Sequence, residues 1–259
     1  MFVRFAAALL AVPLIQMGVS PVGAQTAPVN AVGVVDPGIG YADLADLVVA
    51  SPLIIDATIR SASRIKGAEA AGVAINAARF YVEGDVVTLV RGTGAIPARV
   101  GWLVDVPLDA RGRAPSLKKQ RVLAFARPVA GRAEQIELVA RDAQRPWSPG
   151  TDALTRRIAT EAAGADAPPV VTGVKSAFFV PGSLPGEGET QIFLTTQDNR
   201  PAALSVLRRP GEQPRWSVAL SEVIDENATA PTRDTLLWYR LACFLPAALP
   251  ANATAALSE

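Results

Sequence analysis

The sequence contains no histidine, and Cys243 is the only cysteine among its 259 residues. The missing histidine excludes Ser-His-Asp and Cys-His catalysis, histidine-ligated zinc and any histidine-based pH switch. A single cysteine excludes an intrachain disulfide, a thiolate metal cluster and dithiol redox chemistry. Because half of the residues are hydrophobic, the chain can instead rely on a packed core for its stability.

An excess of either charge is also missing, since 25 basic side chains stand against 24 acidic ones. A chain this close to neutral gives no general electrostatic reason for binding nucleic acid, and we expect no such partner. The pair Gly92 and Gly94 lacks the third glycine of a dinucleotide fingerprint and is typical of a turn. The sequence therefore predicts no cofactor and no metal site.

The N-terminus has the three parts of a secretory signal peptide. Arg4 supplies a positive charge, residues 6–19 are apolar, and small residues end at Ala24. This pattern predicts a signal peptide over residues 1–24, cleavage near Ala24 and a periplasmic address. The alternative is a retained membrane anchor, which the short apolar run disfavours, so we expect no transmembrane span in the mature chain.

Residues 25–147 are predicted to form a β-rich domain that begins with a helix near Tyr41–Ser51. In the run Arg99–Val106, for example, apolar residues alternate with polar ones, which is typical of an antiparallel strand with one solvent-exposed face. Five such strands suit a small barrel, with an OB-like barrel as the first candidate and a sandwich or meander as alternatives. The runs are residues 55–60, 80–83, 99–106, 121–127 and 135–141.

Residues 148–259 are predicted to form a second, α+β domain. Thr151 is a candidate N-cap for a helix with Leu154, Ile158 and Ala162 on one face. Turn residues then separate four further strand-like runs, which favours an antiparallel sheet. These runs are residues 170–180, 190–196, 202–208 and 216–223.

The most apolar stretch of the second domain is Leu236–Leu245, in which Arg240 is the only charged residue. Apolar residues surround the helix on all sides, which predicts a buried helix at about 232–246, with Thr232 as its N-cap. We expect Cys243 to be inert inside it and Arg240 to reach the surface or a carboxylate. The alternative is an exposed helix that docks on a partner or a membrane surface.

The candidate binding site is a basic stretch between two predicted strands. It could bind phosphate, lipid headgroups or an acidic partner, although a solvated loop explains the charges too. The sequence Ser116-Leu117-Lys118-Lys119 also matches the S-x-x-K motif of penicillin-recognising enzymes, but the S-D-N and K-T-G elements are missing. The basic residues are Arg111, Arg113, Lys118, Lys119 and Arg121.

Two carboxylate pairs are weaker candidates for acid–base or cation chemistry. Glu187 and Glu189 lie in a glycine- and proline-rich segment that is better explained as a turn. Asp105 and Asp109 flank Pro107, where the change from strand to turn accounts for both.

Three stretches, Tyr41–Val48, Val180–Leu194 and Asp234–Cys243, resemble exported proteins of sphingomonad-type alphaproteobacteria. The resemblance implies a Gram-negative periplasmic address, but it transfers no activity and no functional residues. We therefore expect a non-enzymatic periplasmic or envelope protein with a binding or structural role, whose partner is an envelope protein or an anionic envelope component. The alternative is a hydrolase or transferase that uses carboxylates, hydroxyls or lysines.

Overall fold

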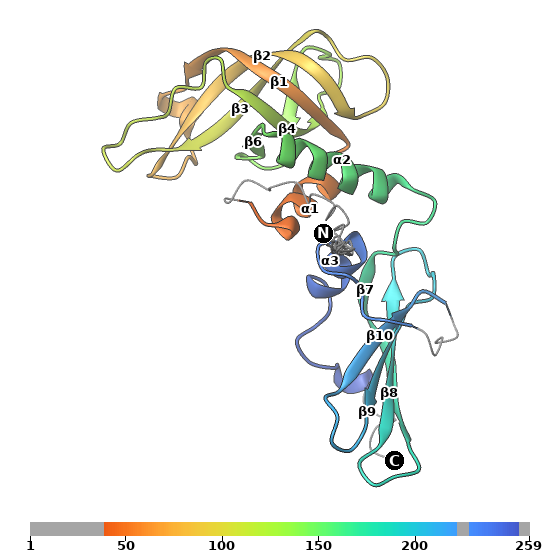
Figure 1. Ribbon diagram of the computed structural model, residues 1–259. Helices are drawn as coiled ribbons and strands as arrows, with labels where there is room; N and C mark the ends of the chain where they lie inside the picture. Colours follow the sequence, from red (N-terminus) through yellow and green to blue (C-terminus); the bar gives the residue numbers. More distant parts are fainter. Residues whose placement is uncertain (1–38, 222–227, 254–259) are drawn as a thin grey trace, which may run out of the picture. The chain divides into compact units, whose positions relative to one another are not determined.

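The computed structural model describes residues 39–221 and 228–253, which contain two antiparallel sheets and three α-helices (Figure 1). The predicted β-rich α+β class is confirmed at this level. The predicted signal peptide lies outside the described residues. None of the helices in the described ranges is both long enough and apolar enough to cross a membrane.

The first sheet has six strands in the order β3–β2–β1–β4–β5, and β6 also pairs with β4. Every pair is antiparallel, as the alternating runs predicted. The inward-facing residues Val100, Trp102 and Val104 are each only 1% exposed. The strands are β1 (Leu53–Arg64), β2 (Ala77–Arg91), β3 (Arg99–Pro107), β4 (Arg121–Pro128), β5 (Ile136–Leu138) and β6 (Gln144–Pro146).

The ladder pairs of this sheet do not close into a barrel within the described residues. β1 and β2 shift register at three points, and such irregularities bend a strand and increase its twist. The two ends of the strand order are nevertheless linked by backbone hydrogen bonds. Gly101 N–H donates to the carbonyl of Glu134, and Asp105 N–H donates to that of Arg141, both at 2.8 Å.

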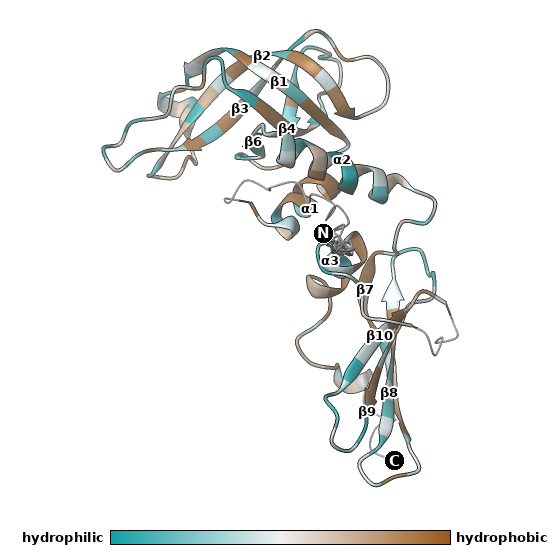
Figure 2. Ribbon diagram, in the orientation of Figure 1, coloured by the Kyte–Doolittle hydropathy of each residue, from teal (hydrophilic) through white to brown (hydrophobic). Residues whose placement is uncertain are grey.

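Two helices, α1 (Tyr41–Ala50) and α2 (Pro149–Ala163), add apolar side chains to the core of this sheet. Figure 2 shows hydrophobic residues along α1 and along the strands. The N-cap of α2 is Ser148, whose hydroxyl accepts a bond from Thr151 N–H at 3.1 Å. The prediction of Thr151 as the cap was wrong, because Pro149 is pre-organised for the first helical position and starts the helix earlier.

The second sheet has four strands in the order β10–β9–β8–β7. Its small core contains Val171, Leu194 and Leu204 from the strands and Leu241 from α3. The remaining elements are β7 (Val171–Pro181), β8 (Gly188–Thr196), β9 (Ala203–Arg208), β10 (Arg215–Ala219), α3 (Leu236–Ala242) and the short 3-10 helices η1 (Gly67–Ala70) and η2 (Ala251–Ala253).

Helix α3 is shorter than predicted and contributes side chains to two hydrophobic cores. It begins after Thr235, whose hydroxyl accepts a bond from Trp238 N–H, so the prediction of Thr232 as N-cap was wrong. Leu236 packs into the core of the first sheet, whereas Leu241 packs into that of the second. Cys243 is the C-cap and is exposed, which corrects the prediction of a buried thiol.

Arg240 is buried on α3, with 7% of its surface exposed, and makes no side-chain hydrogen bond or ion pair with the described residues. Burial lowers the pKa of Arg240, and the positive charge of Arg200 nearby lowers it further. Among the described residues no carboxylate pairs with this guanidinium, so the expected exit to the surface or contact with a carboxylate stays a prediction.

Candidate functional site

The basic stretch predicted from the sequence lies in the loop between β3 and β4, but its five cations differ in their surroundings. Arg121 is at the start of β4, and its guanidinium binds the carboxylate of Asp56 through two hydrogen bonds of 2.9 and 2.6 Å. The same guanidinium carbon lies 3.7 Å from the ring centroid of Trp147. Arg121 is therefore a structural residue of the sheet.

Arg111 and Arg113 lie on a turn that Asp109 organises. One oxygen of Asp109 accepts the backbone N–H groups of both arginines at 2.9 Å, and the other pairs with the Arg113 guanidinium at 3.1 Å. The Arg113 N–H bond, followed by the Arg111 N–H bond, lowers the pKa of Asp109. Asp109 thus holds the turn, while the Arg111 side chain is exposed and has no side-chain partner in the described ranges.

Lys118 and Lys119 are on the returning part of the loop, beside the middle of β1. Lys119 has a φ of 68°, and its N–H donates to the carbonyl of Ile59 at 2.7 Å. Both ammonium groups are exposed and have no partner among the described side chains. Ser116 lies in irregular backbone and not at the start of a helix, so the S-x-x-K match has no catalytic geometry.

The loop between β1 and β2 lies at the same end of the sheet as the turn that carries Arg111. The first residue of β2, Ala77, pairs with Pro107 at the end of β3, and Leu108 N–H donates to the carbonyl of Asn76 at 2.8 Å. Ile75 in this loop is fully exposed, and no periodic pattern in the sequence singled it out. Lys66 from the same loop is exposed as well.

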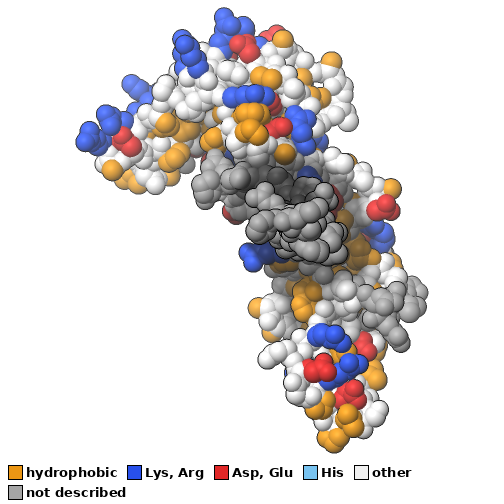
Figure 3. All heavy atoms as spheres, viewed as in Figure 1, with side chains coloured by type: hydrophobic (Ala, Val, Ile, Leu, Met, Phe, Trp, Pro, Cys, Tyr) orange, Lys and Arg blue, Asp and Glu red, His pale blue; other side chains and the backbone are white. Residues whose placement is uncertain are grey.

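Figure 3 shows Lys and Arg side chains at the end of the six-stranded sheet, with hydrophobic side chains beside them. We use the name cationic surface for the exposed basic residues of the two loops and of the end of β1. These residues are Arg64, Lys66, Arg111, Arg113, Lys118 and Lys119.

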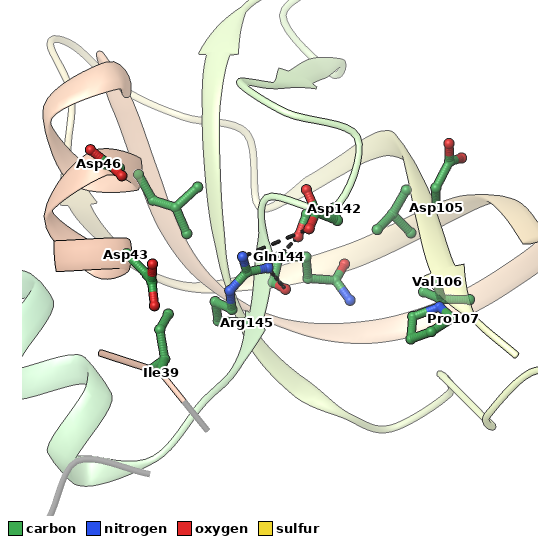
Figure 4. Close-up of a pocket in the computed structure, with 11 residues that line it drawn as sticks. Ile39, Asp43, Asp46, Asp105, Val106, Pro107, Asp142, Gln144 and Arg145 are labelled. Atoms are coloured by element: carbon green, nitrogen blue, oxygen red, sulfur yellow. Dashed lines mark hydrogen bonds and ion pairs between the residues drawn. The ribbon is translucent and has the colours of Figure 1, made fainter. Parts of the chain in front are cut away.

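A cleft of about 540 Å³ lies between α1, β3 and the segment around β6 (Figure 4). Four aspartates and one arginine line it, together with apolar side chains that include Leu47 and Val104. Figure 4 shows Arg145 directed toward Asp142, to which it is linked by an ion pair of 3.9 Å and by a bond to the backbone carbonyl. The sequence did not single out this cleft, because its acids come from three separate segments.

Two carboxylates of this cleft, those of Asp105 and Asp46, have structural roles. Asp105 binds the guanidinium of Arg79 at two points, 2.7 and 2.8 Å, and Asp46 accepts the hydroxyl hydrogen of Tyr239. Asp105 and Asp109 have separate arginine partners and do not form a metal-binding pair. A carboxylate held in this way is poorly prepared to act as a general acid or base, because protonation would break its bonds.

A second cavity, of about 470 Å³, is formed where β3 approaches β5. Tyr81, Leu103 and Val129 give it a largely apolar wall, and Arg141 and Glu137 stand among its lining residues. The hydroxyl of Tyr81 lies over Gly101, where an added Cβ would come within 2.1 Å of it. A side chain at position 101 would therefore displace the tyrosine that forms this wall.

Glu187 lies in the turn between β7 and β8, as the turn interpretation predicted, whereas Glu189 is in strand β8 and binds a residue of β9. Glu187 Oε2 accepts the N–H groups of Ser183 and Leu184 at 3.2 and 3.3 Å. Glu189 Oε1 accepts the hydroxyl hydrogen of Ser205 at 2.7 Å. The two carboxylates belong to different hydrogen-bond groups and do not face a common reactive centre.

Comparison of this chain with models of protein families gives no match, and comparison with curated proteins gives none either.

Proposed function

We propose that this protein is a non-enzymatic component of the cell envelope that binds an anionic partner through its cationic surface. The observation that supports this proposal is the state of Lys66, Arg111, Lys118 and Lys119. All of them are exposed, and none has a side-chain hydrogen bond or ion pair with the described residues. Their charges are thus not neutralised by a described ion pair, and a positively charged cluster attracts anions even on a chain of neutral total charge.

The proposed envelope address comes from the sequence. Residues 1–24 have the pattern of a signal peptide, and the exported context leaves anionic headgroups and envelope proteins as the anions that the chain meets. The two loops that carry most of these cations contain two carboxylates, Glu69 and Asp109, which are fewer than the cations of the cationic surface. Asp109 is moreover occupied by the turn that it organises.

A binding role accounts better than an enzymatic one for the carboxylates of the larger cleft. Asp46 and Asp105 are each bonded to a side chain of another element, and Asp142 pairs with Arg145 at 3.9 Å. A hydrolase or transferase without histidine would need at least one carboxylate free to exchange a proton with its substrate. We therefore assign no general acid or base to a carboxylate of this cleft.

The six-stranded sheet is further proposed to be a partly open, OB-like barrel. Two features support this finer description: the strand order β3–β2–β1–β4–β5 and the backbone bonds that link Gly101 and Asp105 of β3 to the segment around β5. A five-stranded, partly open barrel is the arrangement typical of this class.

The test is binding of the full chain to soluble inorganic polyphosphate, measured by isothermal titration calorimetry at low and high salt. Replacing Arg111, Lys118 and Lys119 by glutamine should weaken binding about tenfold or more, and added salt should weaken the unaltered chain. The control replaces Arg208 and Arg215, which are exposed on the second sheet, and should leave binding unchanged. Equal affinities for both variants would refute the proposed function.

A further inference from the structure

The β1–β2 loop places a fully exposed isoleucine at one end of the six-stranded sheet. Ile75 follows the uncharged sequence Ala71-Gly72-Val73-Ala74, and Val73 is partly exposed. An exposed large apolar side chain is common on a protein surface and carries no meaning alone. Ile75 becomes informative because its loop and the neighbouring loop also carry exposed cations without a partner among the described residues.

The loop is held in shape, so that the exposure of Ile75 is not an accident of a loose chain. Arg79, which is buried, donates from Nη1 to the carbonyls of Glu69 and Ala71 at 3.4 and 3.3 Å. Its other nitrogens bind Asp105, and Ala77 N–H closes a turn on the carbonyl of Ala74 at 2.9 Å. The fold therefore fixes the turn that presents Ile75 to solvent.

Cations flank this apolar turn on two sides. Lys66 lies in the same loop, and Arg64 precedes it at the end of β1. Arg111 lies in the neighbouring β3–β4 loop. The two loops are joined where Leu108 N–H donates to the carbonyl of Asn76, the residue after Ile75. An apolar tip with basic side chains in its own loop and in the neighbouring loop matches the interface of an anionic bilayer, where apolar groups enter the acyl boundary and cations meet the phosphates.

We propose that this end of the sheet docks on an anionic lipid bilayer, with Ile75 inserted and Lys66 and Arg111 at the headgroups. The inference rests on the proposed function, because it uses the same cationic surface, and it names the partner as a membrane. The cations alone could equally bind a soluble phosphate compound. A soluble anion gives no reason for an exposed isoleucine, whereas a bilayer does.

The first experiment places an environment-sensitive fluorophore at position 75 of the full chain, in the double variant Ile75→Cys and Cys243→Ser. Vesicles containing phosphatidylglycerol should shift its emission to the blue, and vesicles of phosphatidylcholine alone should shift it much less. The matched control carries the label at Val87, which is exposed near the opposite end of β2, and should show no shift. This readout reports on the surroundings of position 75, and comparison with the label at Val87 separates it from membrane binding by distant segments.

The second experiment measures partition of unlabelled variants onto the same vesicles. Ile75→Ser should weaken the component of binding that depends on anionic lipid by about tenfold, while Lys66→Gln and Arg111→Gln should each weaken it by about fivefold. High salt should reduce the effect of both charge variants. Ile75→Ser should leave polyphosphate binding unchanged, because that binding needs only the cations.

The outcomes separate this inference from the proposed function. A label at position 75 that does not respond to anionic vesicles, or that responds no more than the label at Val87, refutes membrane docking. If the glutamine variants still lose polyphosphate affinity in that case, the anion-binding function stands and its partner is soluble or proteinaceous. If they keep that affinity, both proposals fail.

Discussion

Arg121 and Asp56 join β4 to β1 through two charge-assisted hydrogen bonds of 2.9 and 2.6 Å. Asp56 is 1% exposed, whereas the Arg121 side chain is 40% exposed and rests on the ring of Trp147. The pair satisfies a carboxylate that would otherwise be buried without a partner, and such a carboxylate would be strongly destabilising. The arginine therefore belongs to the sheet and not to the cationic surface that begins beside it.

Loss of this pair should lower stability without reducing anion binding. Asp56→Ala should lower the free energy of unfolding by about 2–4 kcal/mol, since two bonds between charged groups are lost and Arg121 can still turn to water. Arg121→Gln should also destabilise the protein, because it leaves Asp56 buried and unpaired. Urea denaturation measures both changes, and polyphosphate affinity at low temperature should equal that of the unaltered chain. A loss of affinity in Arg121→Gln would show that this residue belongs to the binding surface.

The two buried tyrosines of the helical region should differ in how removal of the hydroxyl group changes stability. Tyr239 donates to Asp46, so Tyr239→Phe should lower the free energy of unfolding by about 1.5–3 kcal/mol. The hydroxyl of Tyr41 is buried without a hydrogen-bond partner in the described part of the chain, so Tyr41→Phe should be neutral or stabilising. Chemical denaturation at neutral pH measures the difference, and equal losses would contradict it.

Alkaline pH should destabilise the protein partly through Tyr41. Burial, followed by the nearby charge of Glu161, raises the pKa of Tyr41 from 10.0 to about 12. A raised pKa in the folded state gives stability that is complete below pH 10 and is lost as the pH rises toward 12. Tyr41→Phe should reduce this alkaline loss, as followed by unfolding curves and tyrosinate absorbance. An unchanged pH profile in the variant would assign the loss to other groups.

The close approach of β2 to Trp102 should make Gly84 intolerant of a side chain. A Cβ at position 84 would lie 2.6 Å from Cη2 of the Trp102 indole and 3.3 Å from Cβ of Ala57. Trp102 is 1% exposed, and its Nε1 donates to Gln144 at 2.9 Å, so it has little freedom to move. Gly84→Ala should cost about 1–3 kcal/mol.

The control for this substitution is Gly173→Ala in β7, where nothing lies within 4 Å of the added Cβ. Near-UV circular dichroism should change in the first variant, because the environment of Trp102 changes, and not in the second. If both variants have the same stability and spectrum, the indole adjusts more easily than its contacts suggest.

The strands could be predicted from the sequence because alternation reports burial directly, as the buried Val100, Trp102 and Val104 demonstrate. The helix caps could not be placed with the same accuracy. Several hydroxyl residues precede α2 and α3, and the choice of Ser148 and Thr235 depends on where the backbone turns into the helix. Tertiary context decides such local details.

The candidate site was only partly predictable for the same reason. The basic stretch is visible in the sequence, but the partner that removes Arg121 from it lies 65 residues away. Ile75 had no signal, because a single apolar residue in an alanine-rich stretch is equally compatible with burial and exposure. Its exposure follows from the turn that Arg79 fixes, which only the fold reveals.

The stability of the second sheet should depend on one residue of α3. Leu241 is 3% exposed and packs with Val171, Leu194 and Leu204 in a small core, so a carboxylate at position 241 would be buried without a partner. Leu241→Asp should cost about 3–5 kcal/mol and expose the second sheet to limited proteolysis. Cys243→Ala, one helical position beyond the last turn, should change the free energy of unfolding by no more than about 0.5 kcal/mol, because Cys243 is exposed. If Leu241→Asp is as stable and as protease-resistant as Cys243→Ala, this face of α3 is exposed to solvent. The stretch Leu236–Leu245 would then be the exposed docking helix, the alternative that its sequence left open.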